Sequence, residues 1–286
     1  MLSRELIEQI RGLQLRAGRV VTEALSGEYH SAFKGQGIEF DELREYTPGD
    51  DIRSIDWKVT ARMGQAFVKV FREEREQTLM LIIDVSASQD YTSHYRLKKE
   101  VAAEMAAILA YLATTNNDRV GLIIFSDHVE KFIPPKKGRS HIWNIIRTVL
   151  TFEPEGTKTN IKAALDFFQS ITPKKSICFV ISDFITDHFQ EAMARTARKH
   201  ELVAISIIDP GEVKPEPIGL IEIEGIEDQQ RRNIFLKDSK ETERSKLQRR
   251  WQKDWLRSGI QSFTLRTDQD TVEPLKAFIA RKERRR

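Results

Sequence analysis

The chain has 286 residues, of which 40% are hydrophobic and 31% charged, a composition typical of a soluble globular protein. Its 46 basic and 43 acidic residues leave a net charge of +3, which is too balanced to indicate nucleic-acid binding. No apolar run approaches the roughly 20 residues of a membrane helix, and the charged start of the chain is unlike a signal peptide. The single cysteine, Cys178, can form no intrachain disulfide. We therefore expect a cytoplasmic protein.

The first quarter of the chain differs from the rest in its pattern of apolar and turn-forming residues. Residues 1 to about 24 carry apolar side chains at helical spacing, and Gly27 marks a break. The next segment, residues 28–77, is rich in turns. At residues 47–50, for example, proline and glycine stand where a type II turn requires them. We expect residues 1–77 to form an N-terminal helix and a small loop-rich β subdomain with a short antiparallel sheet.

From residue 78 onward, short apolar runs alternate with segments of helical periodicity. This alternation predicts an α/β fold with a doubly wound, mostly parallel sheet and helices on both faces. We expect this domain to extend over residues 78–286, with an insertion at about 210–240 that forms a hairpin. The expected strands are 79–84, 119–125, 129–133, 176–182, 202–208 and 260–265, and the expected helices are about 95–116, 140–151, 159–170, 187–199, 240–257 and 271–283.

The most informative stretch is Asp84-Val85-Ser86-Ala87-Ser88, which follows the continuously apolar run of residues 79–83. Such a run is typical of a buried parallel strand, and ligands of open α/β sheets bind beyond the carboxyl ends of such strands. One carboxylate and two hydroxyls offer the hard oxygen ligands that Mg²⁺ prefers. The alternative is a loop that merely caps the next helix.

Two further loops support the metal hypothesis. Ser182-Asp183 directly follows a second apolar run at residues 177–181, and Thr159 opens a helical pattern. Both loops belong to the alternating strand–helix series. Together the three loops offer one set of oxygen ligands: Asp84, Ser86, Ser88, Thr159 and Asp183.

In these motifs the sequence resembles a von Willebrand factor A domain. The resemblance implies a metal-ion-dependent adhesion site, in which the Asp-x-Ser-x-Ser loop, a threonine and a second aspartate hold Mg²⁺ or another divalent cation. Residues 158–165 look like the threonine loop, although Lys158 stands where the family often has glycine. Thr157 is therefore a rival of Thr159 for the threonine role.

The N-terminal part carries a second, more specific pattern, which comprises Glu39-Phe40, Leu43-Arg44-Glu45-Tyr46, Pro48-Gly49-Asp50-Asp51 and Ser54-Ile55-Asp56-Trp57. This pattern resembles that of the bacterial family called domain of unknown function 58. Members commonly carry a von Willebrand A-like domain and are commonly encoded beside a MoxR-type AAA+ ATPase. Many have membrane helices; this chain looks like the short soluble form. We expect the charged residues of this segment to form a salt-bridged network and Trp57 to anchor it to the sheet.

These features favour a non-enzymatic binding module. In this hypothesis, the metal accepts a carboxylate from a protein partner, and the resemblance implies a MoxR-type AAA+ ATPase as that partner, in assembly or metal insertion of client proteins. The alternative is a Mg²⁺-dependent phosphotransferase or hydrolase that uses Asp84. Such chemistry needs a second acid two residues further on, where this chain has Ser86.

Overall fold

The computed structural model describes residues 4–21, 23–33, 38–73, 76–93, 95–213, 219–224, 231–236 and 243–284. The chain divides into two compact units, which we describe separately. The larger contains Met1–Ala32 and Thr78–Arg286, and the smaller contains Phe33–Gln77. The expected boundary therefore needs a correction, because the N-terminal helical segment belongs to the α/β unit and not to the small subdomain.

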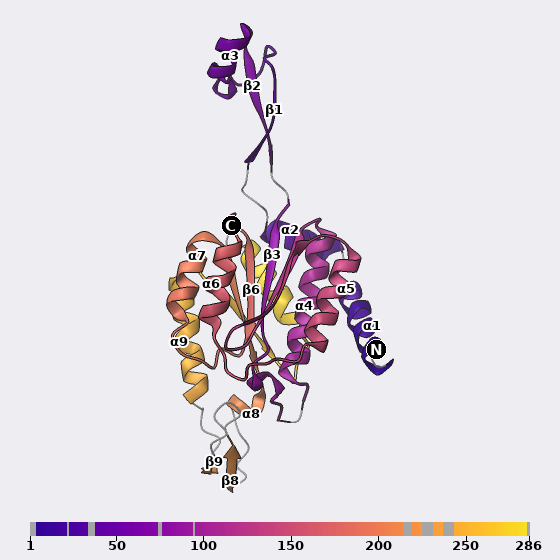
Figure 1. The fold of residues 1–286 in the computed structure, drawn as a ribbon, viewed down its shortest axis with the longest axis vertical. Helices are drawn as coiled ribbons and strands as arrows, with labels where there is room; N and C mark the ends of the chain where they lie inside the picture. The colour runs from indigo at the N-terminus through magenta and orange to yellow at the C-terminus, as the bar shows by residue number, and fades with distance from the viewer. Residues whose placement is uncertain are drawn as a thin grey trace. The chain divides into compact units, whose positions relative to one another are not determined.

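The larger unit is built on a six-stranded sheet (Figure 1). Its strand order is β10-β7-β6-β3-β4-β5, and every neighbouring pair is parallel except β4 with β5. This is the doubly wound, mostly parallel α/β sheet that the sequence predicts. The strands are β3 (Thr78–Asp84), β4 (Arg119–Phe125), β5 (Val129–Lys136), β6 (Ile177–Ser182), β7 (Glu201–Ile208) and β10 (Gln261–Arg266).

Helices cover both faces of this sheet (Figure 1). One layer contains α1 (Arg4–Val20), α2 (Glu23–Ala32), α4 (Lys98–Thr115), α5 (Arg139–Thr151) and α10 (Val272–Glu283). The other contains α6 (Ile161–Ile171), α7 (Gln190–Lys199) and α9 (Glu243–Arg257), whose apolar side chains share one core cluster with the sheet. Helix α4 is apolar on nearly all sides because the sheet and other helices surround it.

The N-terminal helical segment differs from the expectation. Helix α1 ends at Val20, and a second helix, α2, continues through Gly27, so that glycine does not mark a break. Both helices contact α4, and α2 also packs on α10. Tertiary packing thus outweighs the weak helix propensity of glycine.

The edge strand of the larger unit also extends beyond its expected range of residues 129–133. Strand β5 runs through Pro134 and Pro135 to Lys136 instead of ending at the prolines. An edge strand tolerates proline because one side of it makes no ladder hydrogen bonds. In α9, Trp255 is buried, whereas Leu247 is 44% exposed. The short segments η2 (Ala87–Asp90) and α8 (Pro210–Val213) complete the unit.

The expected hairpin of the insertion is present. Strands β8 (Gly219–Glu224) and β9 (Arg231–Leu236) pair antiparallel, with Leu220 opposite Phe235. The residues between these strands lie outside the described part of the chain.

The smaller unit pairs β1 (Ile38–Glu45) antiparallel with β2 (Phe67–Glu73) and carries η1 (Ile52–Ser54) and helix α3 (Trp57–Met63). The predicted turn is present, with Gly49 at φ +114° and a 3.0 Å hydrogen bond from the amide of Asp50 to the carbonyl of Thr47. Arg44 donates two hydrogen bonds, of 2.7 and 2.6 Å, to the carboxylate of Asp50, as expected of a salt-bridged loop network.

Trp57 is not the buried anchor that we expected. Its side chain is 66% exposed, and Asp56 caps the helix that begins with it. Neither η1 nor α3 contains a buried residue, because this small unit encloses little core.

Candidate metal centre

The candidate centre lies where the strand order of the large sheet reverses. Strands β3 and β6 are neighbours, but the chain leaves β3 toward β4 on one side and β6 toward β7 on the other. Asp84 is the last residue of β3, and Asp183 directly follows β6. Ligands of doubly wound sheets bind at this switch point, because the loops on either side diverge and leave the strand ends accessible.

The Asp-x-Ser-x-Ser loop is folded back on its own aspartate. The amide of Ser86 donates to Oδ1 of Asp84 over 2.9 Å, and the hydroxyls of Ser86 and Ser88 lie 3.2 Å apart. The side chains of all three residues are buried. Here the alternative of a helix-capping loop has little support, because Ser86 makes no side-chain capping bond to the short helix η2 that follows it.

Thr159 joins this group from a second loop. Its hydroxyl donates to Oγ of Ser86 over 2.8 Å, and its side chain is buried. The rival, Thr157, is exposed and contributes its backbone instead, since its carbonyl accepts a 3.1 Å hydrogen bond from the amide of Ala87. The geometry therefore favours Thr159 as the threonine of the site.

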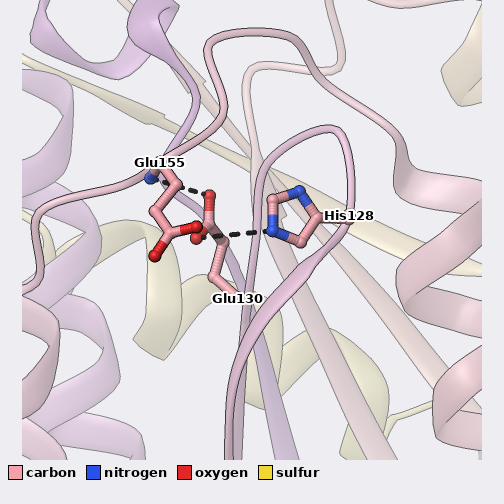
Figure 2. Close-up of side chains that lie close together, drawn as sticks. All are labelled: His128, Glu130 and Glu155. Atoms are coloured by element: carbon pink, nitrogen blue, oxygen red, sulfur yellow. Dashed lines mark hydrogen bonds and ion pairs between the residues drawn. The ribbon is translucent and has the colours of Figure 1, made fainter.

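The threonine loop is fixed by a buried carboxylate that the sequence did not indicate. Glu130, on the edge strand β5, accepts hydrogen bonds from the amides of Glu155 and Gly156 at 3.1 and 2.9 Å. Oγ of Ser126 donates to the same carboxylate over 2.6 Å. Figure 2 shows Glu130 between Glu155 and His128. Glu130 thus holds the loop that carries Thr159.

His128, Glu130 and Glu155 also lie close enough together to suggest a second cation site (Figure 2). His128 and Glu155 are exposed, however, and Glu130 already accepts several hydrogen bonds. Burial raises the pKa of Glu130, but hydrogen bonds from Ser126, Gly156 and Glu155 outweigh it, so the pKa is lowered overall. These contacts make Glu130 a structural anchor.

The two aspartates of the candidate centre interact through their charges. Oδ2 of Asp84 accepts a 2.6 Å hydrogen bond from the hydroxyl of Ser182, the residue before Asp183. Burial, followed by the negative charge of Asp183, raises the pKa of Asp84 to about 7. The hydrogen bonds from Ser182 and Ser86 lower it only partly. Neutral hydrogen-bond donors alone offset the negative charge of a buried carboxylate only in part, and a bound cation would offset the remainder.

The loop after β6 has an unusual backbone. Phe184 has φ +58°, a conformation that bulky residues rarely adopt. It is stabilised by a 2.9 Å hydrogen bond from the amide of Phe184 to Oγ of Ser182, and by burial of the ring among Phe189 and Trp255. This turn lets the amide of Ile185 donate to Oδ1 of Asp183 over 3.1 Å and so orients that carboxylate.

Sequence reasoning missed a cation that already occupies part of the centre. Nζ of Lys98, the first residue of α4, donates to Oδ2 of Asp183 over 2.8 Å and also bonds Glu212 of α8. Lys98 is fully buried. The signal available in the sequence was its position on the apolar stripe of α4, three residues before Val101.

The structure thus brings the predicted residues together in two linked groups. Ser86, Ser88 and Thr159 share one hydroxyl cluster, to which Asp84 is joined by its hydrogen bond from the amide of Ser86. Asp183 acts on Asp84 through its charge. This donor set of carboxylates and hydroxyls fits a hard divalent cation such as Mg²⁺. The oxygen ligands would come from Asp84, Ser86, Ser88 and Thr159. Asp183 would contribute its negative charge from a neighbouring position.

The strand order and this loop arrangement define a doubly wound α/β protein with a candidate metal centre at the switch point of its sheet. A family model described as "Protein of unknown function DUF58" matches residues 42–254, and the chain therefore belongs to this family. The uncharacterized protein Rv1480 of Mycobacterium tuberculosis is 27% identical over 287 residues, covering 98% of this chain and 90% of that protein. The uncharacterized protein YeaD of Bacillus subtilis is 30% identical over 105 residues, covering 37% of this chain and 24% of that protein.

Solved structures are more distant. An aerotolerance-related membrane protein of Bacteroides fragilis is 18% identical with a TM-score of 0.49, covering 73% of this chain and 100% of that chain. The SpRpn10 VWA domain is 10% identical with a TM-score of 0.40, covering 70% of this chain and 94% of that chain. Neither likeness carries an argument about function. Within the described ranges of this chain, no helix combines the length and hydropathy of a membrane span.

Proposed function

We propose that this protein is a non-enzymatic adaptor that binds a partner protein through a divalent cation. The observation that carries the proposal is the buried hydroxyl cluster of Ser86, Ser88 and Thr159 beside Asp84, a carboxylate whose pKa is raised by burial and by Asp183. A bound cation would compensate Asp84, and an acidic side chain of the partner would complete its coordination.

The proposed partner is a MoxR-type AAA+ ATPase, and the proposed role is assembly or metal insertion of client proteins. This choice of partner rests on the sequence resemblance, because members of the family that the chain belongs to are commonly encoded beside such an ATPase. The chemistry of the centre agrees with it, because a metal–carboxylate bond gives an orientation and strength that an exposed salt bridge lacks.

The alternative is a Mg²⁺-dependent phosphotransferase or hydrolase with Asp84 as nucleophile. Two observations weigh against it. The position of the required second acid is held by Ser86, and both oxygens of Asp84 accept hydrogen bonds, from the amide of Ser86 and the hydroxyl of Ser182. Assays with ATP and generic phosphoesters distinguish the two functions. We expect no hydrolysis above an Asp84→Ala control, and activity that depends on Asp84 would establish the enzyme.

The metal centre itself is tested by isothermal titration of the purified protein with MgCl₂ and MnCl₂. We expect one binding site in the wild type and none in Asp84→Asn, which keeps the size of the side chain but removes its charge. Thr159→Ala should weaken binding, since it removes a hydroxyl of the cluster. Thr157→Ala is the matched control and should bind as the wild type does. Equal affinity in Asp84→Asn and wild type would refute the proposed centre.

A further inference from the structure

The ammonium of Lys98 lies within the anionic part of the candidate centre. It bonds Oδ2 of Asp183 and a carboxylate oxygen of Glu212, and the side chains of Lys98 and Asp183 are both fully buried. Tyr91, in the loop that follows the Asp-x-Ser-x-Ser motif, places its ring 5.6 Å from the same nitrogen. The lysine thus links the ends of β6 and β7 to the loop of the proposed metal ligands.

Burying an ammonium group is costly unless carboxylates compensate it, and Lys98 is held by two. A divalent cation bound by Asp84 and the hydroxyl cluster would need the same negative potential. Asp183 contributes to that potential, because its charge is one of the causes that raise the pKa of Asp84. The lysine and the metal would therefore share Asp183.

We infer that Lys98 is a tethered competitor of the metal ion, which lowers the affinity of the centre for divalent cations by neutralising Asp183. This inference rests on the proposed function, because it presupposes that the centre binds a metal. In this inference, Lys98 sets the affinity of the centre for the cation. Because the lysine is present, the cation binds reversibly, and the centre stays folded when no cation is bound.

Removing the positive charge should strengthen cation binding. A unit charge one side chain away from a divalent ion acts strongly in a buried site, so Lys98→Gln should bind Mn²⁺ and Mg²⁺ about tenfold more tightly or better. Glutamine retains a hydrogen-bond donor toward Asp183 while losing the charge. The matched control is Lys99→Gln, which removes the same charge from the next residue, where the side chain is exposed and pairs with Asp90. We expect no change in that variant.

A second variant tests the inference in the opposite direction. Glu212→Gln removes one of the two carboxylates that pair with Lys98, so that Asp183 remains as the charged partner of the lysine in this pair of contacts. Cation affinity should fall, because the centre loses negative charge while the competitor remains. This variant keeps the test decisive if Lys98→Gln does not fold without metal.

The experiment is calorimetric titration of the four proteins with MnCl₂ and MgCl₂, together with thermal melting with and without 5–10 mM cation. Tighter binding in Lys98→Gln, or refolding of that variant by the cation, supports the inference. Binding in Lys98→Gln that is equal to or weaker than in the wild type overturns it, as does unchanged affinity in Glu212→Gln. Absence of binding in the wild type and in Lys98→Gln alike instead refutes the metal centre, so the two failures are distinguishable.

Discussion

At the scale of single residues, the two aspartates of the centre differ in the groups that offset their negative charges. Asp183 has an ammonium partner in Lys98, whereas Asp84 accepts hydrogen bonds from Ser86 and Ser182, which are neutral donors. The charge balance of the site is therefore incomplete at Asp84. This asymmetry leads to a prediction about pH.

We expect cation affinity to depend on pH through Asp84. Burial and the charge of Asp183 raise the pKa of Asp84 to about 7, so the proton competes with the metal below that pH. Affinity should rise about tenfold per pH unit up to roughly pH 7 and then level off. Titration with MgCl₂ between pH 5.5 and 8.5 measures this. A flat profile across that range would show that no proton leaves Asp84 when the cation binds.

The raised pKa of Asp84 also affects the stability of the metal-free protein, which should fall, whereas cation affinity rises, as the pH increases. An aspartate has an ordinary pKa of about 3.9, so the folded state binds this proton more tightly than the unfolded state. Its contribution to the free energy of unfolding is present below about pH 4 and is lost as pH rises to about 7. Added cation should restore stability above pH 7, and thermal melting of Asp84→Asn should show neither effect.

At the scale of elements, the threonine loop depends on a close backbone approach at Gly156. A Cβ at this position would lie 2.4 Å from Oγ of Ser126 and 2.4 Å from Oδ1 of Asp127. Ser126 cannot yield easily, because it is fully buried and its hydroxyl is bonded to Glu130. The loop therefore fits only while residue 156 has no side chain.

We predict that Gly156→Ala displaces this loop and withdraws Thr159 from Ser86. Cation affinity should fall by about tenfold, comparable to the loss of one ligand, while the sheet remains folded. The matched control is Gly27→Ala, where a Cβ meets nothing within 4 Å. That variant should leave cation affinity unchanged and stabilise α2 by about 0.5–1 kcal/mol. Wild-type affinity in Gly156→Ala would mean that the loop adjusts without moving Thr159.

The strands that build the site could be predicted from the sequence because their signal is local. The continuous apolar run before Asp84 marks a strand buried on both faces, and the polar residues after it mark the sheet edge where ligands bind. Lys98 and Glu130 could not be predicted as parts of the site, since their roles depend on contacts with residues 85 and 26 positions away. Trp57 was assigned wrongly because an aromatic residue in a small unit need not be buried.

At the scale of the whole molecule, the chain combines an α/β unit that carries the candidate centre with a small unit whose helix α3 exposes Trp57 and Met63. Exposed apolar side chains of this size are common at protein–protein contacts. A partner could therefore dock on either unit, and the dependence of binding on metal separates the two possibilities.

We predict that the MoxR-type ATPase of the same host binds this protein only in the presence of a divalent cation. Loss of one partner from a bonded charge pair costs about 2–5 kcal/mol, so Asp84→Ala or EDTA should weaken binding roughly thirtyfold or more. The fold should survive the substitution, because Asp84 lies at the end of β3 and its side chain packs against polar groups of the loops. The measurement is titration of the ATPase with wild type and Asp84→Ala, each with and without EDTA. Equal affinity in all four conditions would place the docking surface away from the metal centre, and loss of binding in Trp57→Ala would then assign it to the small unit.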